Sequence, residues 1–254
     1  MKTELLLDLD GTVYLDGVVF DGLREEMQRV SDLGIGINYM TNNTSMSIVD
    51  YKKRISDKGL IFDTTKVFSP SIVAQEWLKA NNIADIYLVG TDSLRKEIEN
   101  GSFVNCMSDN PELVLIGFDK ELTYQKLFDA CGHINNGISW YQTHIDISCP
   151  TSDGPMPDCG AISNIIQETT NKPSSGDFGK PSKLFAEYVK SSFSHESELI
   201  VVGDRLYTDA ETGLAMGART VVVCTGEYKA SSREKVDARI EVNDSLRSFL
   251  ALNF

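Results

Sequence analysis

The sequence is poor in the residues that usually build zinc sites, and it contains no long apolar run. Its five cysteines are scattered and include no Cys-x-x-Cys pair, so we expect reduced thiols rather than a zinc site. His133, His144 and His195 lack metal-ligand spacing, and surface or core positions are expected for them. Without a membrane-length apolar run or a signal peptide, the chain is expected to be cytoplasmic.

Basic residues are also scarce. Lysine and arginine number 24 against 37 acidic residues, which gives a formal charge of −13 over 254 residues. A surface of this charge repels nucleic acid and anionic membranes, so neither is an expected partner. The length is sufficient for one large domain or two modest ones. An anionic ligand would need positive charge supplied locally, by a metal ion or a well-placed lysine.

Short apolar segments alternate with helix-like segments along the chain. The predicted strands are 4–9, 35–40, 86–89, 113–117, 139–143, 199–203 and 220–224. The predicted helices are 21–33, 47–58, 69–79, 93–100, 123–134, 160–170, 182–192 and 209–216. This alternation predicts an α/β protein with a Rossmann-like parallel sheet, which binds ligands at the carboxyl ends of its strands.

Two aspartates stand at the end of the first predicted strand, in the segment Asp-Leu-Asp-Gly-Thr. Alternate residues of a strand share a face, so Asp8 and Asp10 begin on one side before the chain turns. Close carboxylates repel each other unless a cation intervenes, and Mg²⁺ prefers such oxygen ligands. Asp8 could then attack phosphorus, while Asp10 could exchange a proton with the leaving oxygen and with water. Taken alone, the segment also fits a turn or a cap.

Two polar motifs follow in similar positions. Thr41 and Asn42 come directly after the second strand, where hydroxyl and N–H groups can cradle an anion, although a plain polar turn is the simpler interpretation. Lys180 lies in Gly-Lys-Pro, with Pro181 expected at the first position of a helix. The lysine could offset the charge of a phosphate and of Asp8, or it could be an ordinary solvated side chain.

A last acidic motif follows the strand 199–203. Asp204 stands at the strand end, where it could complete a magnesium site. Asp209 could cap the next helix, hold a metal-bound water, or do both.

In this order the four motifs resemble those of the haloacid dehalogenase (HAD) superfamily. They read Asp-x-Asp-Gly-Thr, Thr-Asn-Asn, Gly-Lys-Pro and Gly-Asp-Arg-x-x-Thr-Asp, and the resemblance extends from residue 4 to about 226. Their fuller forms look like the NagD and p-nitrophenylphosphatase group. This resemblance implies a phosphoric monoester hydrolase that acts through an aspartyl-phosphate. Asp10 argues against dehalogenation, because that branch of the superfamily keeps no second aspartate there.

The resemblance also implies a role for each motif residue. Asp8 would be the nucleophile and Asp10 the general acid and base. Mg²⁺, the implied cofactor, would be bound by the Asp8 side chain, the Asp10 backbone carbonyl and Asp204. Asp209 would help to hold these metal ligands in place without binding the ion directly. The phosphate would be bound by Thr41, Asn42 and Lys180.

The same resemblance predicts two domains. Residues 1–81 and 175–254 would form the catalytic core, and residues 82–174 an inserted α/β cap. The segment from Cys149 to Gly160 looks like the family's substrate-specificity loop, with Asp153, Asp158 and Cys159 as candidate contacts. Asp158 departs from the family pattern. It could face a hydroxylated or cationic leaving group, or merely cap the helix that follows.

Two other functions are compatible with parts of this pattern. A phosphosugar mutase would use the same motifs but would protect its phospho-aspartate from water. A receiver-like signalling module also clusters acids, Thr and Lys around Mg²⁺, but it has no use for the inserted segment or for Asp10. For a phosphatase, the expected partner is a small phosphorylated metabolite such as a sugar phosphate, glycerol phosphate, nucleotide, pyridoxal phosphate or p-nitrophenyl phosphate. A homodimer is also possible.

Overall fold

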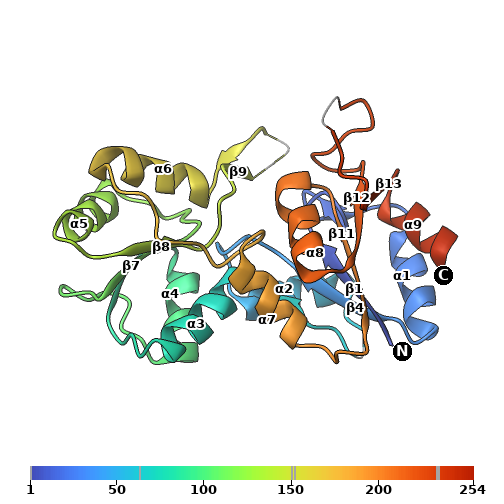
Figure 1. Ribbon diagram of the computed structural model, residues 1–254, viewed down its shortest axis with the longest axis horizontal. Coiled ribbons are helices and arrows are strands. Elements are labelled where there is room, and N and C mark those ends of the chain that lie inside the picture. Colours follow the sequence, from blue (N-terminus) through green and yellow to red (C-terminus); the bar gives the residue numbers. More distant parts are fainter. Residues whose placement is uncertain (1, 63, 150, 152, 233–234) are drawn as a thin grey trace. The chain divides into compact units, whose positions relative to one another are not determined.

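The computed structural model describes residues 2–62, 64–149, 151, 153–232 and 235–254, which form two compact units (Figure 1). Unit 1 contains the chain up to Thr41 together with Tyr51–Phe68 and Lys180–Phe254. Unit 2 contains Asn42–Asp50 and Ser69–Gly179. The chain therefore passes between the units directly after Thr41 and directly before Lys180. No helix in the described ranges is long and apolar enough to cross a membrane.

The packing units differ from the predicted domain boundaries in three places. The segments 42–50, 69–81 and 175–179 pack with unit 2, whereas the sequence places them with the catalytic core. The functional division into a core and a specificity cap stays a prediction.

Unit 1 is built on a six-stranded parallel sheet in the order β13-β12-β11-β1-β4-β5. In that order the strands are Ile240–Asn243, Arg219–Val223, Glu198–Gly203, Thr3–Asp8, Gly36–Met40 and Val67–Phe68. Strand β1 lies between β11 and β4, and its residues Leu5, Leu6 and Leu7 are fully buried. A strand that is buried on both faces reads as a continuous apolar run, which is why the sequence pattern identifies it.

Helices cover both faces of this sheet. Figure 1 shows α1 (Leu23–Asp32) and α9 (Leu246–Asn253) on one face, and α7 (Lys183–Ser191) and α8 (Glu211–Met216) on the other. Helix α1 buries Leu23, Met27 and Val30, an apolar stripe with helical spacing. The remaining elements are the hairpin of β2 (Tyr14–Leu15) with β3 (Val18–Val19), and α2 (Ile48–Asp57), which spans the boundary between the packing units.

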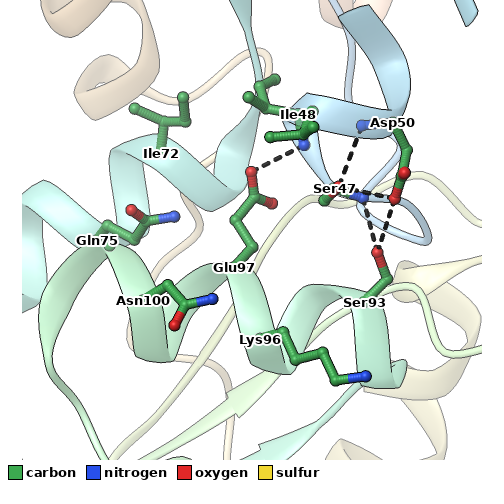
Figure 2. Close-up of a pocket in the computed structure, with 11 residues that line it drawn as sticks. Ser47, Ile48, Asp50, Ile72, Gln75, Ser93, Lys96, Glu97 and Asn100 are labelled. Atoms are coloured by element: carbon green, nitrogen blue, oxygen red, sulfur yellow. Dashed lines mark hydrogen bonds between the residues drawn. The ribbon is translucent and has the colours of Figure 1, made fainter. Parts of the chain in front are cut away.

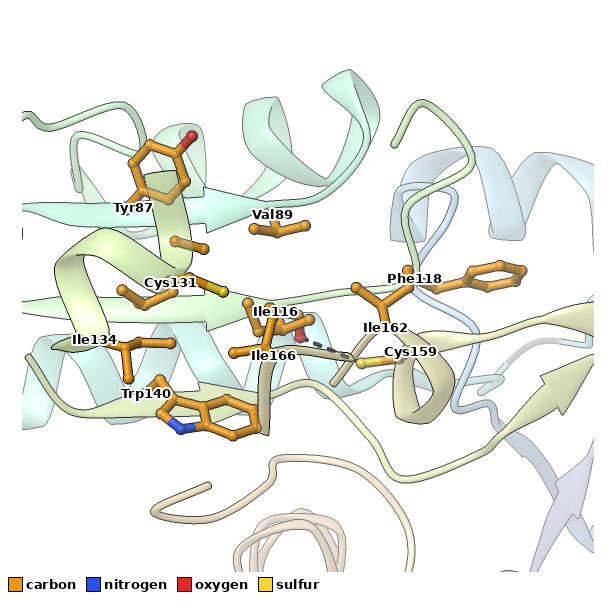
Figure 3. Close-up of a cluster of buried hydrophobic side chains, with 12 residues drawn as sticks. Tyr87, Val89, Ile116, Phe118, Cys131, Ile134, Trp140, Cys159, Ile162 and Ile166 are labelled. Atoms are coloured by element: carbon orange, nitrogen blue, oxygen red, sulfur yellow. Dashed lines mark hydrogen bonds between the residues drawn. The ribbon is translucent and has the colours of Figure 1, made fainter. Parts of the chain in front are cut away.

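Unit 2 contains a parallel three-stranded sheet in the order β6-β7-β8. Its strands are Ile86–Val89, Leu113–Ile116 and Trp140–Gln142. Its helices are α3 (Pro70–Ala80), α4 (Asp92–Ser102), α5 (Tyr124–Asn135) and α6 (Cys159–Thr170), and a short hairpin pairs β9 (Ser148–Cys149) with β10 (Met156–Pro157). Helices α5 and α6 pack on one face of the sheet, where side chains such as Ile116, Ile162 and Trp140 form a common core (Figure 3).

Candidate active site

The ends of three neighbouring strands form the candidate active site of unit 1. Asp8 is the last residue of β1, Asp204 directly follows β11, and Thr41 directly follows β4. These strands are parallel neighbours, so their carboxyl ends lie at the same edge of the sheet. The sheet therefore gathers groups that are far apart in the sequence.

Lys180 is the central cation of this site. Its side chain is only 2% exposed, and its Nζ lies 2.6 Å from Asp8 Oδ1 and 2.6 Å from Asp209 Oδ1. Burial alone would lower the pKa of Lys180, but the charges of Asp209 and Asp8 outweigh it and raise that pKa above its ordinary value. The ammonium therefore stays protonated, and the interpretation of Lys180 as a solvated lysine is wrong.

The sequence predicts Pro181 at the first position of a helix, and this prediction is wrong. Helix α7 begins at Lys183, and Ser182 is its N-cap, with the serine side chain accepting a hydrogen bond from Phe185 N. The lysine is thus held by the loop before the helix.

Asp209 connects the lysine to the loop after β11. It lies in a π-helical turn over Leu206–Ala210, and its Oδ2 accepts hydrogen bonds from the backbone N–H groups of Asp204 (3.2 Å) and Arg205 (3.1 Å). Helix α8 has Ala210 as its N-cap and no side-chain cap, so the expectation that Asp209 caps this helix is wrong. Its carboxylate instead shapes the loop that carries Asp204.

Asp204 is packed tightly between two glycines. A Cβ atom at Gly11 or at Gly226 would overlap its carboxylate, and Gly11 also has a positive φ of 95°. Its Oδ2 accepts a hydrogen bond from Glu227 N at 2.6 Å. Its Oδ1 is buried and has no hydrogen-bond partner among the described residues. Such an oxygen is suited to bind a cation.

The charges of the cluster are unbalanced. Carboxylate oxygens of Asp8, Asp204 and Asp209 lie within 4.8 Å of one another, and three carboxylates against the Lys180 ammonium leave two negative charges. Burial, followed by the charge of Asp209, raises the pKa of Asp204 to about 6. Burial also raises the pKa of Asp8 well above its usual value, although Lys180 opposes this. A bound divalent cation would neutralise the cluster and keep Asp8 ionised.

Asp10 and Thr41 border the same sheet edge. Asp10 is half-buried, directly after the first strand, and forms a short bridge with Tyr14. Thr41 is buried, and its N–H donates to Phe68 O at 3.0 Å. The structure thus brings six of the predicted residues together in unit 1: Asp8, Asp10, Thr41, Lys180, Asp204 and Asp209.

The other predicted residues belong to unit 2. Asn42 donates a hydrogen bond from Nδ2 to Asp146 Oδ2 at 3.1 Å. Asp158 is the N-cap of α6, as one interpretation of the sequence expects. Cys159 is buried, and its thiol donates to Ile116 O at 3.3 Å (Figure 3). Asp153 is exposed in the loop between β9 and β10.

His144 and Asp146 are buried polar residues that the sequence pattern does not single out. His144 is fully buried, and its Nε2 lies 2.8 Å from Asp158 Oδ1. Of the surface and core positions that the sequence leaves open, His144 occupies a core one, and its pairing with a carboxylate is not foreseen. The sequence shows only a His-x-Asp segment followed later by a Pro-Asp pair. The contact between them forms because the β9-β10 hairpin brings the two segments together.

A separate pocket of about 600 Å³ lies in unit 2 beside the start of α2 (Figure 2). Its polar groups bond to one another: Glu97 Oε1 accepts from Ile48 N at 2.8 Å, and Ser93 Oγ accepts from Ser47 N at 3.0 Å. None of the predicted site residues lines it.

Comparisons with known proteins agree with the motifs. A sequence profile described as haloacid dehalogenase-like hydrolase matches residues 5–103, and one described as HAD-hydrolase-like matches residues 177–249. The 5'-nucleotidase YutF of Bacillus subtilis (strain 168) is 30% identical over 230 residues, which are 88% of each chain. The chain therefore belongs to the haloacid dehalogenase-like hydrolases.

Solved structures give the same result for the fold. The 4-nitrophenylphosphatase of Thermotoga maritima is 31% identical, with a TM-score of 0.88 over 98% of this chain and 97% of that one. A putative NagD protein is 32% identical, with a TM-score of 0.88 over 100% of this chain and 98% of that one. The predicted similarity to the NagD and p-nitrophenylphosphatase group is confirmed, and so is the α/β fold class. The protein is an enzyme, a hydrolase of the HAD family.

Proposed function

We propose that the protein is a Mg²⁺-dependent phosphatase that hydrolyses a small phosphate monoester through an aspartyl-phosphate on Asp8. The observation that carries this proposal is the buried Lys180 ammonium, 2.6 Å from both Asp8 and Asp209, at the edge of the sheet where Asp204 also lies. The names of the relatives, a 5'-nucleotidase and a 4-nitrophenylphosphatase, support the same class of substrate.

The first step forms the covalent intermediate. An oxygen of the Asp8 carboxylate attacks the phosphorus atom, and the bond between phosphorus and the ester oxygen breaks. Asp10 donates a proton to that leaving oxygen, so the alcohol departs neutral. Lys180, with Thr41 and Asn42, binds the phosphoryl oxygens and stabilises the charge that develops on them.

The second step releases phosphate. Asp10, now ionised, takes a proton from a water molecule as that water attacks the phosphorus of the aspartyl-phosphate. The bond between phosphorus and the Asp8 oxygen breaks, which restores the Asp8 carboxylate and liberates inorganic phosphate. Both catalytic carboxyl groups return to their starting protonation states, so the cycle can repeat.

The residues present fit a magnesium ion. Asp8, the Asp10 backbone carbonyl and Asp204 would bind it, and Asp209 would support these ligands from behind. The unpartnered Asp204 Oδ1 and the two uncompensated negative charges support this assignment. When bound, Mg²⁺ would offset negative charge on the phosphate and on Asp8.

The substrate class and the mechanism are tested together by a phosphate-release screen. The purified protein with Mg²⁺ would be offered nucleotides, sugar phosphates, glycerol phosphate, pyridoxal phosphate and p-nitrophenyl phosphate. We expect stoichiometric release of inorganic phosphate from at least one metabolite. The covalent intermediate would be detected with a ³²P-labelled substrate and an acid quench. Label should remain on the wild-type protein but not on Asp8→Asn. Absence of release from every compound would refute the proposed function.

A further inference from the structure

The loop between β8 and β9 buries polar side chains in unit 2. Thr143 and His144 are fully buried and Asp146 is 4% exposed. Thr143 Oγ1 lies 3.0 Å from His144 Nδ1 and 3.1 Å from Thr44 Oγ1. Burying this much polarity is unfavourable unless the groups are paired, and here the pairings fix the loop in one conformation.

The start of α6 holds this loop in place. Asp158 accepts a hydrogen bond from Cys159 N at 2.6 Å as the helix cap, and its Oδ1 also lies 2.8 Å from His144 Nε2. Gly160 N donates to the Asp146 backbone carbonyl at 2.8 Å. A Cβ at Gly160 would overlap the loop backbone at Ile145, so only glycine allows this close approach. Both the side chain of His144 and the backbone of Asp146 are therefore anchored to one rigid helix.

The anchored loop contacts one residue from each of two motifs, Asn42 of Thr-Asn-Asn and Gly179 of Gly-Lys-Pro. Asp146 Oδ2 accepts the hydrogen bond from Asn42 Nδ2 at 3.1 Å. A Cβ at Gly179 would lie 2.7 Å from Asn42 Oδ1 and 2.7 Å from His144 Cβ, so Gly179 also packs against both. Asn42 directly follows Thr41 in the chain, and Gly179 directly precedes Lys180.

We propose that Asp146 is a positioning residue, which orients the Asn42 side-chain amide for binding the phosphoryl group. This inference rests on the proposed function, because it assigns Asn42 to the phosphate. An asparagine amide can rotate to exchange its oxygen and nitrogen, and only the nitrogen donates to an anion. A carboxylate acceptor on Nδ2 fixes the orientation of the amide, and it leaves the second N–H of Nδ2, rather than the carbonyl oxygen, for a phosphate.

The Asp146 carboxylate can orient Asn42 because its own loop is held in place. An orienting group is effective only when its own position is fixed by packing and further hydrogen bonds. His144, Asp158 and Gly160 supply that support for Asp146. The α6 start is thereby connected to Asn42 through the hydrogen bond that Asp146 accepts.

Steady-state kinetics of Asp146→Ala with p-nitrophenyl phosphate and Mg²⁺ test this inference. Loss of orientation should raise KM, and the inhibition constant for inorganic phosphate, about 10-fold or more, with a smaller change in kcat. A purely structural defect would instead lower the fraction of active enzyme, which reduces kcat and leaves KM unchanged. Asp146→Asn keeps an acceptor oxygen and should recover most of the loss. If Asp146→Ala does not fold, Asp146→Ser takes its place.

A matched control is available in the same unit. Asp119 is a buried carboxylate that pairs with Lys126 at 2.8 Å. Asp119→Ala should lower the melting temperature as Asp146→Ala does, but leave KM and phosphate inhibition at the wild-type values. An equal rise of KM in both variants would overturn the assignment.

A double-mutant cycle gives the sharpest test. If Asp146 acts through Asn42, Asp146→Ala should raise KM in the wild type but change it less than twofold when Asn42→Ala is already present. The inference is wrong if Asp146→Ala has the same effect in both backgrounds, or if KM stays at the wild-type value. A wild-type protein without any phosphatase activity would instead refute the proposed function on which the inference rests.

Discussion

At the residue scale, the role of Lys180 depends on its burial and its partners rather than on the tripeptide that contains it. Gly-Lys-Pro is a frequent tripeptide, and a lysine in a loop is usually solvated. Here the ammonium is buried between Asp8 and Asp209, each 2.6 Å away. A buried lysine needs paired carboxylates, because an uncompensated charge in a protein interior is very costly. Removing any one of the three groups therefore affects the other two.

Asp8→Asn should abolish turnover while preserving the fold. The amide is nearly the same size as the carboxylate but cannot attack phosphorus. We expect kcat to fall on the order of 10⁴-fold or more, as for other covalent nucleophiles. The measurement is phosphate release by purified protein, with circular dichroism to verify folding. Turnover near the wild-type rate would contradict the covalent mechanism.

Lys180→Ala should impair both binding and catalysis. It removes the cation that we propose binds the phosphoryl oxygens, and it takes away the Lys180 partner of Asp8 and Asp209. We expect kcat/KM to fall roughly 10²-fold or more. Lys190→Ala is a matched control, because that lysine bonds a backbone carbonyl at the end of α8 rather than a carboxylate. Similar kinetics in the two variants would rule out a catalytic role for Lys180.

Asp204 should make the metal-free protein less stable as the pH rises. Its pKa is raised to about 6 in the folded chain, mainly by burial, so the folded state binds the proton more tightly than the unfolded state. The stability from this proton is present at low pH and is lost as pH rises through about 6. The effect is roughly 3 kcal/mol for two pKa units. In chelator, Asp204→Asn should therefore raise the melting temperature more at pH 7.5 than at pH 4.5.

The same variant tests the metal assignment by stability alone. Added Mg²⁺ should raise the melting temperature of wild type at pH 7.5, because it binds only the folded site. Asp204→Asn should show little of this increase. An equal Mg²⁺ effect in both proteins would place the ion elsewhere.

The residues that carry the motifs could be predicted from sequence, and those that position them could not. Asp8, Asp204 and Lys180 stand at strand ends or beside helix starts, where order along the chain already implies proximity. Asp146 contacts Asn42 only because a loop between two strands of unit 2 is folded back on α6. No periodicity or spacing in the sequence encodes such a contact.

At the element scale, the inner strands of the unit 1 sheet could be predicted from the sequence, and its two edge strands could not. The expected strand 4–9 corresponds to β1 (Thr3–Asp8), and 199–203 to β11 (Glu198–Gly203), because both are continuous apolar runs. Strand β13 (Ile240–Asn243) alternates apolar and polar residues over only one short stretch at the sheet edge. Strand β5 has two residues. Neither is long enough to show a period, so both were absent from the prediction.

Helix α6 offers a prediction of its own. Asp158→Ala removes the N-cap and the partner of the buried His144, and should lower the free energy of unfolding by roughly 1–3 kcal/mol. Asp158→Asn still caps the helix and should lose less. The comparison is made by urea unfolding monitored by circular dichroism. No difference between the alanine and asparagine variants would contradict a capping role.

The same two variants test the specificity prediction for Asp158. The quantity to compare is the ratio of kcat/KM for the best metabolite to kcat/KM for p-nitrophenyl phosphate. A leaving-group contact would change this ratio in Asp158→Asn, where the helix is still capped. An unchanged ratio would restrict Asp158 to its structural role.

At the scale of the whole molecule, the charge of the chain and the proposed substrate oppose each other. The formal charge is −13, and the proposed substrate is an anion. The buried cation that contacts the site carboxylates is Lys180, and its ammonium is already shared by two of them. A bound divalent cation, as proposed above, would restore electrostatic balance at the site.

Activity should accordingly depend on Mg²⁺. Chelation should stop turnover, and Mg²⁺ should restore it, whereas Ca²⁺ should restore it poorly. Calcium accepts longer bonds and more ligands, so it would not align the nucleophile and phosphate as a compact octahedral ion does. The measurement is phosphate release in metal-free buffer after each addition. Undiminished turnover in excess chelator would refute the metal requirement.

The strand order of unit 1 has a consequence for synthesis of the chain on the ribosome. Strand β1 is translated long before its neighbour β11, which begins only at Glu198. All residues of unit 2 precede Lys180, so unit 2 can fold while one edge of β1 still lacks its partner. An apolar strand with an open edge is a template for aggregation. A nascent chain released before β11 would therefore carry Asp8, the proposed nucleophile, without Asp204, and it would depend on chaperones to stay dispersed.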